Sequence, residues 1–419
     1  MVCRFLRFFG KSAFLFAAFF YLLVFLPVFP QKPIKDLEPT VILVSLDGFR
    51  ADYLEKYKPP TLLELAQKGV RADLIPVFPT KTFPNHYSIA TGLYPERHGI
   101  VENNMYDFGT VFTIANREEV QNGRWWLGEP IWVTAEKQGR RTAAFFFPGT
   151  EAEIKGIRPK FWKEYDARIP YEERVKTILG WLDLPRTERP QLLILYFDEP
   201  DTSGHECGPE SECVANAIKR VDEQIKALIE GLKARNVFGK VNLIIVSDHG
   251  MATLKPENAV FLDEYFELGL AERILWANEI VQIFPREGQK DFIAEKLKNI
   301  KNAECWKKED IPERFHYRAS PRIAPIVCSA QEGWYLTSRL RYEERKKRPD
   351  FGKIRGAHGY DNQLESMRAI FIAYGRAFKE GKVVEAFPNV DIYNIIAEIL
   401  KISPAENDGN PETVKKVLR

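Results

Sequence analysis

The sequence has almost no excess of charge of either sign. Lys and Arg number 60 against 58 Asp and Glu, which leaves a formal net charge of +2. Proteins that bind nucleic-acid polymers through the phosphates usually carry a clear positive excess, so no such partner is expected. The longest basic run, Arg345–Arg348, is short, and we interpret it as a solvated loop.

Internal repeats and low-complexity segments are missing as well, which argues against a repeat solenoid and against extended disorder. Hydrophobic residues make up 45% of the chain and aromatic residues 13%, and this composition is typical of globular proteins. The length of 419 residues allows one large α/β domain or two ordinary domains.

Cysteine is scarce, with five residues in the whole chain. Cys3 lies near the N-terminus, and the remaining four could form two disulfides in an oxidising compartment. The expected pairs are Cys207–Cys213, which closes a small local loop, and Cys305–Cys328, which joins a hairpin-like region. Four reduced, buried cysteines are the alternative. No pair has the spacing of a zinc finger, so a structural cysteine zinc site is not expected.

The N-terminus carries a targeting signal. Arg4, Arg7 and Lys11 precede an apolar run over residues 12–29, which is close to the shortest length that spans a bilayer. Basic residues before such a run favour a cytoplasmic N-terminus and an exported body, at the cell surface or in the periplasm. We expect a cytoplasmic tail over 1–11, a transmembrane signal anchor over 12–30 and a linker over 31–39. A cleaved signal peptide and secretion are the alternative.

Strand and helix patterns alternate through the rest of the chain. This alternation predicts an α/β fold, with a mainly parallel central sheet covered by helices on both faces. The predicted strands cover residues 40–46, 70–78, 143–147, 191–197, 241–247 and 367–375, and the predicted helices cover 60–69, 84–91, 210–233 and 391–401.

Residues 277–340 have a different pattern of apolar residues, which predicts the order strand, helix, strand, strand. We expect a small α+β subdomain there, inserted into one catalytic domain over 40–405. Residues 406–419 are polar and are expected to form a C-terminal tail.

Acidic residues and histidines follow several of the predicted strands. In a parallel α/β sheet, ligands bind at the carboxyl ends of the strands, and mixed histidine and carboxylate ligands suit zinc. Each residue alone is a weak signal, but their joint placement predicts a metal site. The six residues are Asp47, Asp201, His205, Asp248, His249 and His358. The other histidines, His86, His98 and His316, are expected to be structural.

Thr82 lies between a predicted strand and a predicted helix, just before Pro84. An N-cap role would suit a threonine at this position. Beside two metal ions, however, its hydroxyl would be activated as a nucleophile. The helix N-terminus would also favour an approaching phosphate.

Five segments resemble the nucleotide pyrophosphatase/phosphodiesterase family of the alkaline phosphatase superfamily, in its short single-domain form. The resemblance runs in family order from about Pro39 to Pro404 and implies an alkaline-phosphatase-like fold. The segments are VSLDGFRADYL (Val44–Leu54), FPTKTFPNHYSIATGLYPERHGIVENNMYD (Phe78–Asp107), YFDEPDTSGHECGP (Tyr196–Pro209), SDHGM (Ser247–Met251) and GAHGYDN (Gly356–Asn362).

The resemblance implies two Zn²⁺ ions and assigns a ligand set to each. The first ion would be bound by Asp201, His205 and His358. The second would be bound by Asp47, Asp248, His249 and the oxygen of Thr82.

Further roles at the substrate follow from the same resemblance. Thr82 would be the nucleophile, and the side chain of Asn103 and the backbone amide of Phe83 would bind a phosphate oxygen. Phe83 and Tyr165 would sandwich a nucleobase. Family members often have tryptophan where Phe147 stands.

The implied activity is zinc-dependent hydrolysis of nucleotide phosphodiester or pyrophosphate bonds, as in nucleoside 5′-triphosphates or dinucleoside polyphosphates. A phosphothreonine intermediate would form, and a nucleoside 5′-monophosphate would be released. A choline- or lysophospholipid-type phosphodiesterase is the first alternative, because those relatives share all seven metal positions. A phosphomonoesterase is disfavoured, because no arginine lies beside Thr82. A non-catalytic cell-surface binding domain is the last alternative. The sequence does not determine the oligomeric state.

Overall fold

The computed structural model describes residues 32–419. The predicted N-terminal tail and membrane segment, residues 1–30, therefore lie outside the described residues. Among the helices over 32–419, none combines the length and the apolar character needed to cross a bilayer.

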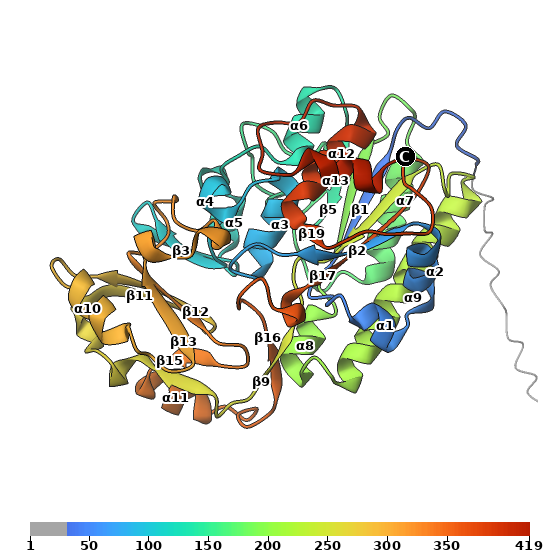
Figure 1. Cartoon of the computed structure of the whole chain (residues 1–419). Coiled ribbons are helices and arrows are strands. Elements are labelled where there is room, and N and C mark those ends of the chain that lie inside the picture. The colour runs from blue at the N-terminus through green and yellow to red at the C-terminus, as the bar shows by residue number, and fades with distance from the viewer. Residues whose placement is uncertain (1–31) are drawn as a thin grey trace, which may run out of the picture.

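A single large sheet forms the centre of the fold (Figure 1). Within residues 32–419 it has nine strands in the order β18-β2-β17-β8-β1-β7-β5-β6, with β19 also paired to β2. All neighbours run parallel except β17, which is antiparallel to both β2 and β8. The strands are β1 (Val41–Leu46), β2 (Val70–Ile75), β5 (Thr142–Phe145), β6 (Phe161–Lys163), β7 (Leu192–Phe197), β8 (Asn242–Val246), β17 (Ala369–Tyr374), β18 (Lys382–Val383) and β19 (Phe387–Pro388).

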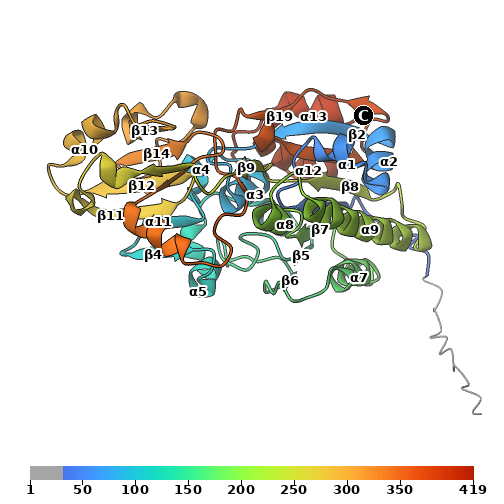
Figure 2. The ribbon, with the colours of Figure 1, turned by 90° about the horizontal axis from the view of Figure 1, so that it is seen from below.

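The central strands are buried along their whole length because helices cover both faces of the sheet. Every residue of β1, Val-Ile-Leu-Val-Ser-Leu, is buried, as expected for a parallel strand between two helical layers. One layer contains α2 (Pro60–Lys68), α7 (Tyr171–Leu182) and α9 (Glu212–Ala234), and the other contains α3 (Thr82–Thr91), α6 (Ile131–Lys137) and α12 (Ile392–Leu400) (Figures 1 and 2). The predicted mainly parallel α/β architecture is thus confirmed.

The longest helix within residues 32–419, α9, shows how the sequence produces this layer. Its buried residues recur every three or four positions, from Val214 through Val221 and Ile225 to Leu232, which is the spacing of one helix face. The helix begins after Ser211, whose hydroxyl accepts a hydrogen bond from the Val214 amide at 3.3 Å. This cap satisfies one of the unpaired amides in the first turn.

The predicted inserted subdomain contains a four-stranded antiparallel sheet with the order β11-β12-β14-β13. Its first strand, β11, ends where the predicted region begins, and its own hydrophobic core draws on residues from Ala252 to Met367. We did not predict β11 from the sequence, because this edge strand is mostly half-exposed and begins with Ala-Glu-Arg. The elements are β11 (Ala271–Ala277), β12 (Ile280–Pro285), α10 (Lys290–Leu297), β13 (Ala303–Lys307) and β14 (Ile326–Ala330).

Short elements complete the fold. Within residues 32–419, three two-stranded ribbons are formed by β3 with β4, β9 with β16, and β10 with β15. The remaining elements are α1 (Tyr53–Tyr57), α4 (Pro95–His98), β3 (Asn104–Asp107), β4 (Thr110–Thr113), α5 (Arg117–Gln121), α8 (Asp201–Cys207), β9 (Ala252–Leu254), β10 (Ala259–Phe261), β15 (Tyr335–Thr337), α11 (Arg339–Lys346), β16 (Arg355–Ala357) and α13 (Pro411–Val417).

Two expectations about surface segments were wrong. The basic run Arg345–Arg348 is not simply a loop, because helix α11 extends to Lys346. The C-terminal residues are not a free tail, because they form α13, which packs on α12 with Val417 fully buried. Only two or three apolar residues anchor α13, and this is too few to produce a clear helical pattern in the sequence.

Both predicted disulfides are present. Cys207–Cys213 joins the end of α8 to the first turn of α9. Cys305–Cys328 links directly opposite residues of β13 and β14. The second bond therefore crosses two neighbouring antiparallel strands in the subdomain.

A buried ion pair ties the subdomain to the main domain. The Lys81 ammonium lies 2.5 Å from the Glu279 carboxylate, and both side chains are almost fully buried. Lys81 immediately precedes α3, whereas Glu279 lies in the turn between β11 and β12. Breaking this pair would leave a buried charge without compensation, which is costly. The contact therefore keeps the start of α3 next to the subdomain.

Candidate active site

The sheet order brings the predicted acidic residues to one place. β1 lies between β7 and β8, and Asp47 follows β1 directly. Asp201 begins α8 shortly after β7, and Asp248 follows β8. Because these three strands are parallel, their carboxyl ends meet at one edge of the sheet.

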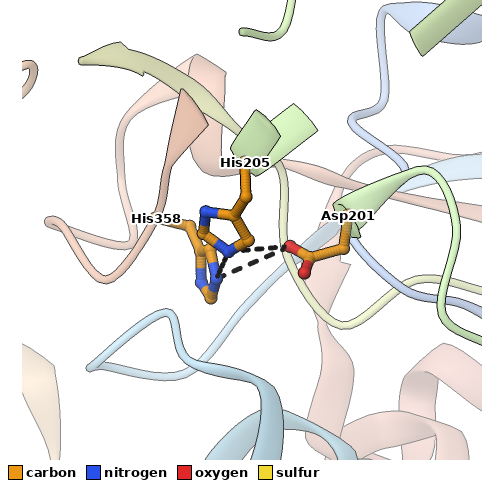
Figure 3. A group of neighbouring side chains, drawn as sticks. All are labelled: Asp201, His205 and His358. Carbon is orange, nitrogen blue, oxygen red and sulfur yellow. Dashed lines mark hydrogen bonds and ion pairs between the residues drawn. The ribbon is translucent and has the colours of Figure 1, made fainter. Parts of the chain in front are cut away.

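Asp201, His205 and His358 form the first group of side chains (Figure 3). Asp201 and His205 lie one turn apart on α8, and His358 follows β16. Asp201 Oδ1 is 3.4 Å from His205 Nε2 and 3.6 Å from His358 Nε2. The two Nε2 atoms are 3.0 Å apart.

The hydrogen bonds of the two Nδ1 atoms, in His205 and His358, determine where the Nε2 lone pairs point. His205 Nδ1 is 3.0 Å from the carbonyl oxygen of Gly356, and His358 Nδ1 is 2.8 Å from that of Thr80. A carbonyl oxygen only accepts, so we assign the proton of each neutral ring to Nδ1. Both Nε2 lone pairs then point at each other. A cation between them would turn this repulsion into ligation, as in metal sites whose histidines are held by their other nitrogen.

Asp47, Asp248 and His249 form a second group beside the first. His249 Nε2 lies 3.0 Å from Asp248 Oδ2 and 3.5 Å from Asp47 Oδ1. His249 Nδ1 is 2.8 Å from the Gly250 carbonyl oxygen, which again turns Nε2 inward. Despite the burial of the ring, the neighbouring Asp248 carboxylate raises the pKa of His249. Asp201 is also within reach of Asp47 and His249, so the two groups adjoin.

Three carboxylate oxygens at this edge have no hydrogen-bond donor among the described residues. They are Asp47 Oδ1, Asp201 Oδ1 and Asp248 Oδ2, and all three atoms are buried. Burial, followed by the neighbouring charges of Asp248 and Asp201, raises the pKa of Asp47 well above its ordinary value. Buried carboxylates without donors are costly unless a cation compensates them. The donor set therefore fits two divalent metal ions of the zinc type.

His86 is a third imidazole next to Asp248, but both of its nitrogens are already used. Nε2 lies 2.8 Å from the Ser45 hydroxyl, and Nδ1 lies 2.9 Å from the Thr82 carbonyl oxygen and 3.2 Å from Asp248 Oδ2. We therefore assign His249, not His86, to the second group. His86 instead bonds the Thr82 carbonyl in the first turn of α3 and lies beside Asp248. Its position four residues after Thr82, on the same helix face, was a signal of the contact with Thr82.

Thr82 lies at the mouth of the second group. It is the first residue of α3, while the N-cap is Lys81, and no side chain caps this helix end. The Thr82 hydroxyl lies 3.4 Å from His249 Nε2. The capping role considered for Thr82 is therefore not the one that it has in the fold, and its hydroxyl is directed toward the metal-ligand candidates.

Asn103 is held beside Thr82 by an unexpected contact. The Phe83 amide donates a hydrogen bond to Asn103 Oδ1 at 2.9 Å, so the amide is not free to bind a phosphate oxygen in this arrangement. The side-chain nitrogen of Asn103 makes no hydrogen bond to any residue within 32–419. That nitrogen is consequently the available donor beside the Thr82 hydroxyl.

Tyr196 is a further contact that the sequence did not indicate. Its hydroxyl donates a hydrogen bond to Asp47 Oδ2 at 2.6 Å. Tyr196 lies on β7, next to β1 in the sheet, and its position in an apolar strand gave no sign of a polar role.

A cavity of about 220 Å³ opens beside Thr82. Phe83 and Tyr165 both line it, as do Phe147 and Arg117. The Tyr165 ring packs edge-on against Phe146, with ring centroids 5.0 Å apart. Aromatic walls next to the nucleophile candidate would accept a flat apolar ring. The other two histidines lie away from this cavity, with His98 bonded to Ser88 and His316 stacked on Tyr94.

Glu102 lies behind Asn103 in a buried, charged cluster. Its Oε1 accepts a hydrogen bond from the backbone amide of Asn103 at 2.8 Å, while Oε2 has no hydrogen-bond partner among the described residues. Burial raises the pKa of Glu102 to about 7 from its ordinary value of 4.5, and the nearby Lys81 ammonium partly opposes the change. The folded protein thus holds one more proton than the unfolded chain between these pH values.

We predict that the contribution of Glu102 to the stability of the fold depends on pH. Because its pKa is raised on folding, its contribution to the free energy of unfolding falls as the pH rises from about 4.5 to about 7, by about 3 kcal/mol. Urea unfolding of the wild type and of Glu102→Gln, at pH 5 and pH 8, measures this loss. The wild type should lose stability relative to the variant over this range. The exposed Glu230→Gln serves as the control, and equal pH profiles for the wild type and Glu102→Gln would contradict the assignment.

Comparisons with known proteins give a consistent result. The profile of the family described as "Type I phosphodiesterase / nucleotide pyrophosphatase" matches residues 41–361. The ectonucleotide pyrophosphatase/phosphodiesterase family member 3 of Rattus norvegicus is 37% identical over 406 residues, covering 93% of this chain and 45% of the relative. The venom phosphodiesterase CdcPDE of Crotalus durissus collilineatus is 38% identical over 403 residues, covering 93% and 47%. The chain thus spans about half the length of these curated relatives.

One solved structure is covered by this chain over the whole of its own length. The murine ectonucleotide pyrophosphatase/phosphodiesterase 5, an inactive threonine-to-alanine variant in complex with AMP, superimposes with a TM-score of 0.84 at 34% identity. The match covers 91% of this chain and 100% of that one.

Proposed function

Because the chain belongs to the type I phosphodiesterase / nucleotide pyrophosphatase family, we propose that it hydrolyses nucleotide phosphodiester or pyrophosphate bonds with two bound zinc ions. The products would be nucleoside 5′-monophosphates. One observation carries this proposal: three buried carboxylate oxygens without donors converge with three inward-facing imidazole nitrogens next to the Thr82 hydroxyl. The alkaline-phosphatase-like α/β fold predicted from the sequence is confirmed by the full-length likeness to a solved relative.

The seven expected ligands divide between two positions. Asp201, His205 and His358 would hold one ion, and Asp47, Asp248, His249 and the Thr82 oxygen would hold the other. When bound, the ions would supply positive charge that lowers the pKa of a nearby hydroxyl and neutralises phosphate oxygens.

The chain's own residues supply the rest of the proposed reaction. Thr82 Oγ attacks phosphorus, and the bond from phosphorus to the leaving oxygen breaks, which leaves a phosphothreonine ester. Water then cleaves this ester and restores the hydroxyl. The Asn103 side-chain nitrogen would donate a hydrogen bond to a nonbridging oxygen whose charge grows in the transition state. His86 would keep Asp248 and the first turn of α3 in place throughout.

Phe83 and Tyr165 support a nucleotide substrate. Both line the cavity next to Thr82, so a base stacked between them would leave its 5′-phosphorus near the nucleophile. The complex of the murine relative contains AMP, which agrees with a nucleotide here. A choline- or lysophospholipid-type phosphodiesterase remains the rival, because the same metal positions would serve it. A non-catalytic binding domain is the second rival.

We also propose the domain organisation predicted from the sequence. Residues 40–405 would form the catalytic domain, and residues 12–30 would act as a transmembrane signal anchor that leaves this domain on the extracytoplasmic side. A cleaved signal peptide is the alternative. The two disulfides fit an oxidising compartment.

The proposed nucleophile leads to a direct prediction. Thr82→Ala should abolish turnover of a nucleoside 5′-phosphodiester, by at least about 10³-fold, because the variant lacks the hydroxyl of the proposed nucleophile. Thr82→Ser should retain measurable activity, since it keeps the hydroxyl.

Metal analysis separates this role from loss of the metal site. Thr82→Ala should keep nearly two equivalents of zinc, because six other ligands remain, whereas His358→Ala should lose about one. Undiminished turnover by Thr82→Ala would contradict the mechanism. A wild type that binds zinc but hydrolyses none of a nucleoside 5′-phosphodiester, glycerophosphocholine and a phosphomonoester would favour the binding-domain alternative.

The aromatic cavity gives a second prediction. Tyr165→Ala should lower kcat/KM for a nucleoside 5′-phosphodiester by about 5- to 100-fold, since stacking of one base is worth about 1–3 kcal/mol. Turnover of glycerophosphocholine should change less than about twofold. Tyr374→Ala, which removes a half-buried tyrosine stacked on Phe238, serves as the control. Equal losses on both substrates would mean that Tyr165 does not bind the base.

A further inference from the structure

A second cavity, of about 640 Å³, lies on the subdomain and shares no lining residue with the cavity beside Thr82. Its wall is formed by α11, the loop that follows it, β15 and the outer ends of β9 and β16 (Figure 1). The proposed phosphodiesterase reaction uses none of these residues. The volume is within the range of small-molecule sites.

The lining of this cavity is strongly basic. Two carboxylates also line it, but both are neutralised: Glu344 pairs with Lys347 at 2.6 Å, and Asp350 pairs with Arg355. The remaining cations have no acidic partner among residues 32–419. These are Arg341, Arg345, Arg348 and Lys353. Four uncompensated positive charges around one concavity repel each other and attract anions.

Two of these cations are held in place by aromatic rings. The Arg345 guanidinium lies 4.9 Å from the centroid of the Tyr335 ring, and the Arg341 guanidinium lies 5.2 Å from that of Trp276. Ring contacts of this kind restrict the arginine side chains before any ligand arrives. A cation that is held in position before binding takes up an anion at a lower cost than a mobile one.

We propose that this cavity binds a small phosphorylated molecule with several negative charges. Planar guanidinium groups match phosphate oxygens in pairs, and three arginines with a lysine could neutralise about four charges. An anion there would lie apart from the zinc ligands. Arg355 pairs with Leu254 at the outer end of the β9–β16 ribbon, and Ala357, the residue before His358, is at the inner end. The ribbon thus separates the two sites by about 7–10 Å of strand.

Calorimetric titration of zinc-loaded full-length protein with inorganic tripolyphosphate tests this proposal. The double variant Arg345→Gln/Arg348→Gln should weaken binding at least tenfold, and binding to the wild type should weaken as salt rises. The matched control is Lys298→Gln/Lys301→Gln, which removes the same charge from exposed positions of the same subdomain and should change binding less than twofold. Unchanged thermal unfolding of both variants verifies their folding.

Three outcomes would overturn the proposal. One is no binding of tripolyphosphate to the wild type at millimolar concentration. Another is equal weakening by the two double variants, which would indicate diffuse attraction to the whole surface. The last is binding that survives Arg345→Gln/Arg348→Gln but is lost in Asp201→Asn, which would place the anion at the metal site. None of these outcomes depends on whether the protein turns over nucleotides.

Discussion

Three aspartates converge at one buried edge of the sheet, and their mutual repulsion is the constraint on which the rest of the site depends. Asp47, Asp201 and Asp248 each direct an oxygen without a donor into the same small volume. Carboxylates cannot remain charged in this way without positive compensation. The Nε2 atoms of His205 and His358 expose lone pairs, not protons, so they cannot compensate. Despite its burial, His249 has a raised pKa because of Asp248, but one imidazolium offsets only one of the three charges. Divalent cations are the partners that satisfy both kinds of ligand at once.

The fold determines this convergence through its strand order. Placing β1 between β7 and β8 brings Asp47 next to the residues that follow both neighbours. The histidines come from less regular elements, and each is held by a backbone carbonyl: His205 by Gly356, His249 by Gly250 and His358 by Thr80. Thr80 precedes Lys81, which the subdomain holds through Glu279. The position of His358 and the start of α3 are therefore linked to the packing of the inserted subdomain.

Strong local patterns in the sequence predicted much of this arrangement. The buried strands were evident because parallel central strands are almost entirely apolar, as in Val41–Leu46, where Ser45 is the single polar residue. The spacing of Asp201 and His205 matched one turn of helix, and α8 provides that turn. Four cysteines allow three pairings, and the observed one was predicted because Cys207 and Cys213 are only six residues apart. The edge strand β11 and helix α13 escaped prediction, because each buries too few side chains to give a periodic pattern.

Contacts between distant segments could not be predicted from the sequence. His86 and Tyr196 touch Asp248 and Asp47, but such contacts follow from packing and not from spacing. The bond from the Phe83 amide to Asn103 also required the fold. Of the two phosphate donors expected from the sequence, it leaves only the Asn103 side chain free. The basic run Arg345–Arg348 was evident in the sequence. Its relation to a cavity was not, because β15, β9 and β16 supply the opposite wall.

The central claim is that this edge of the sheet directs Thr82 at a phosphorus atom. Acid quenching of the zinc-loaded protein during turnover of a nucleoside 5′-phosphodiester, followed by peptide mass spectrometry, tests it most directly. The account predicts a nucleoside monophosphate attached to the peptide that contains Thr82, with fragment ions that assign it to that side chain. Rapid turnover with the adduct on another residue, or with no adduct on Thr82 at any quench time, would contradict the account.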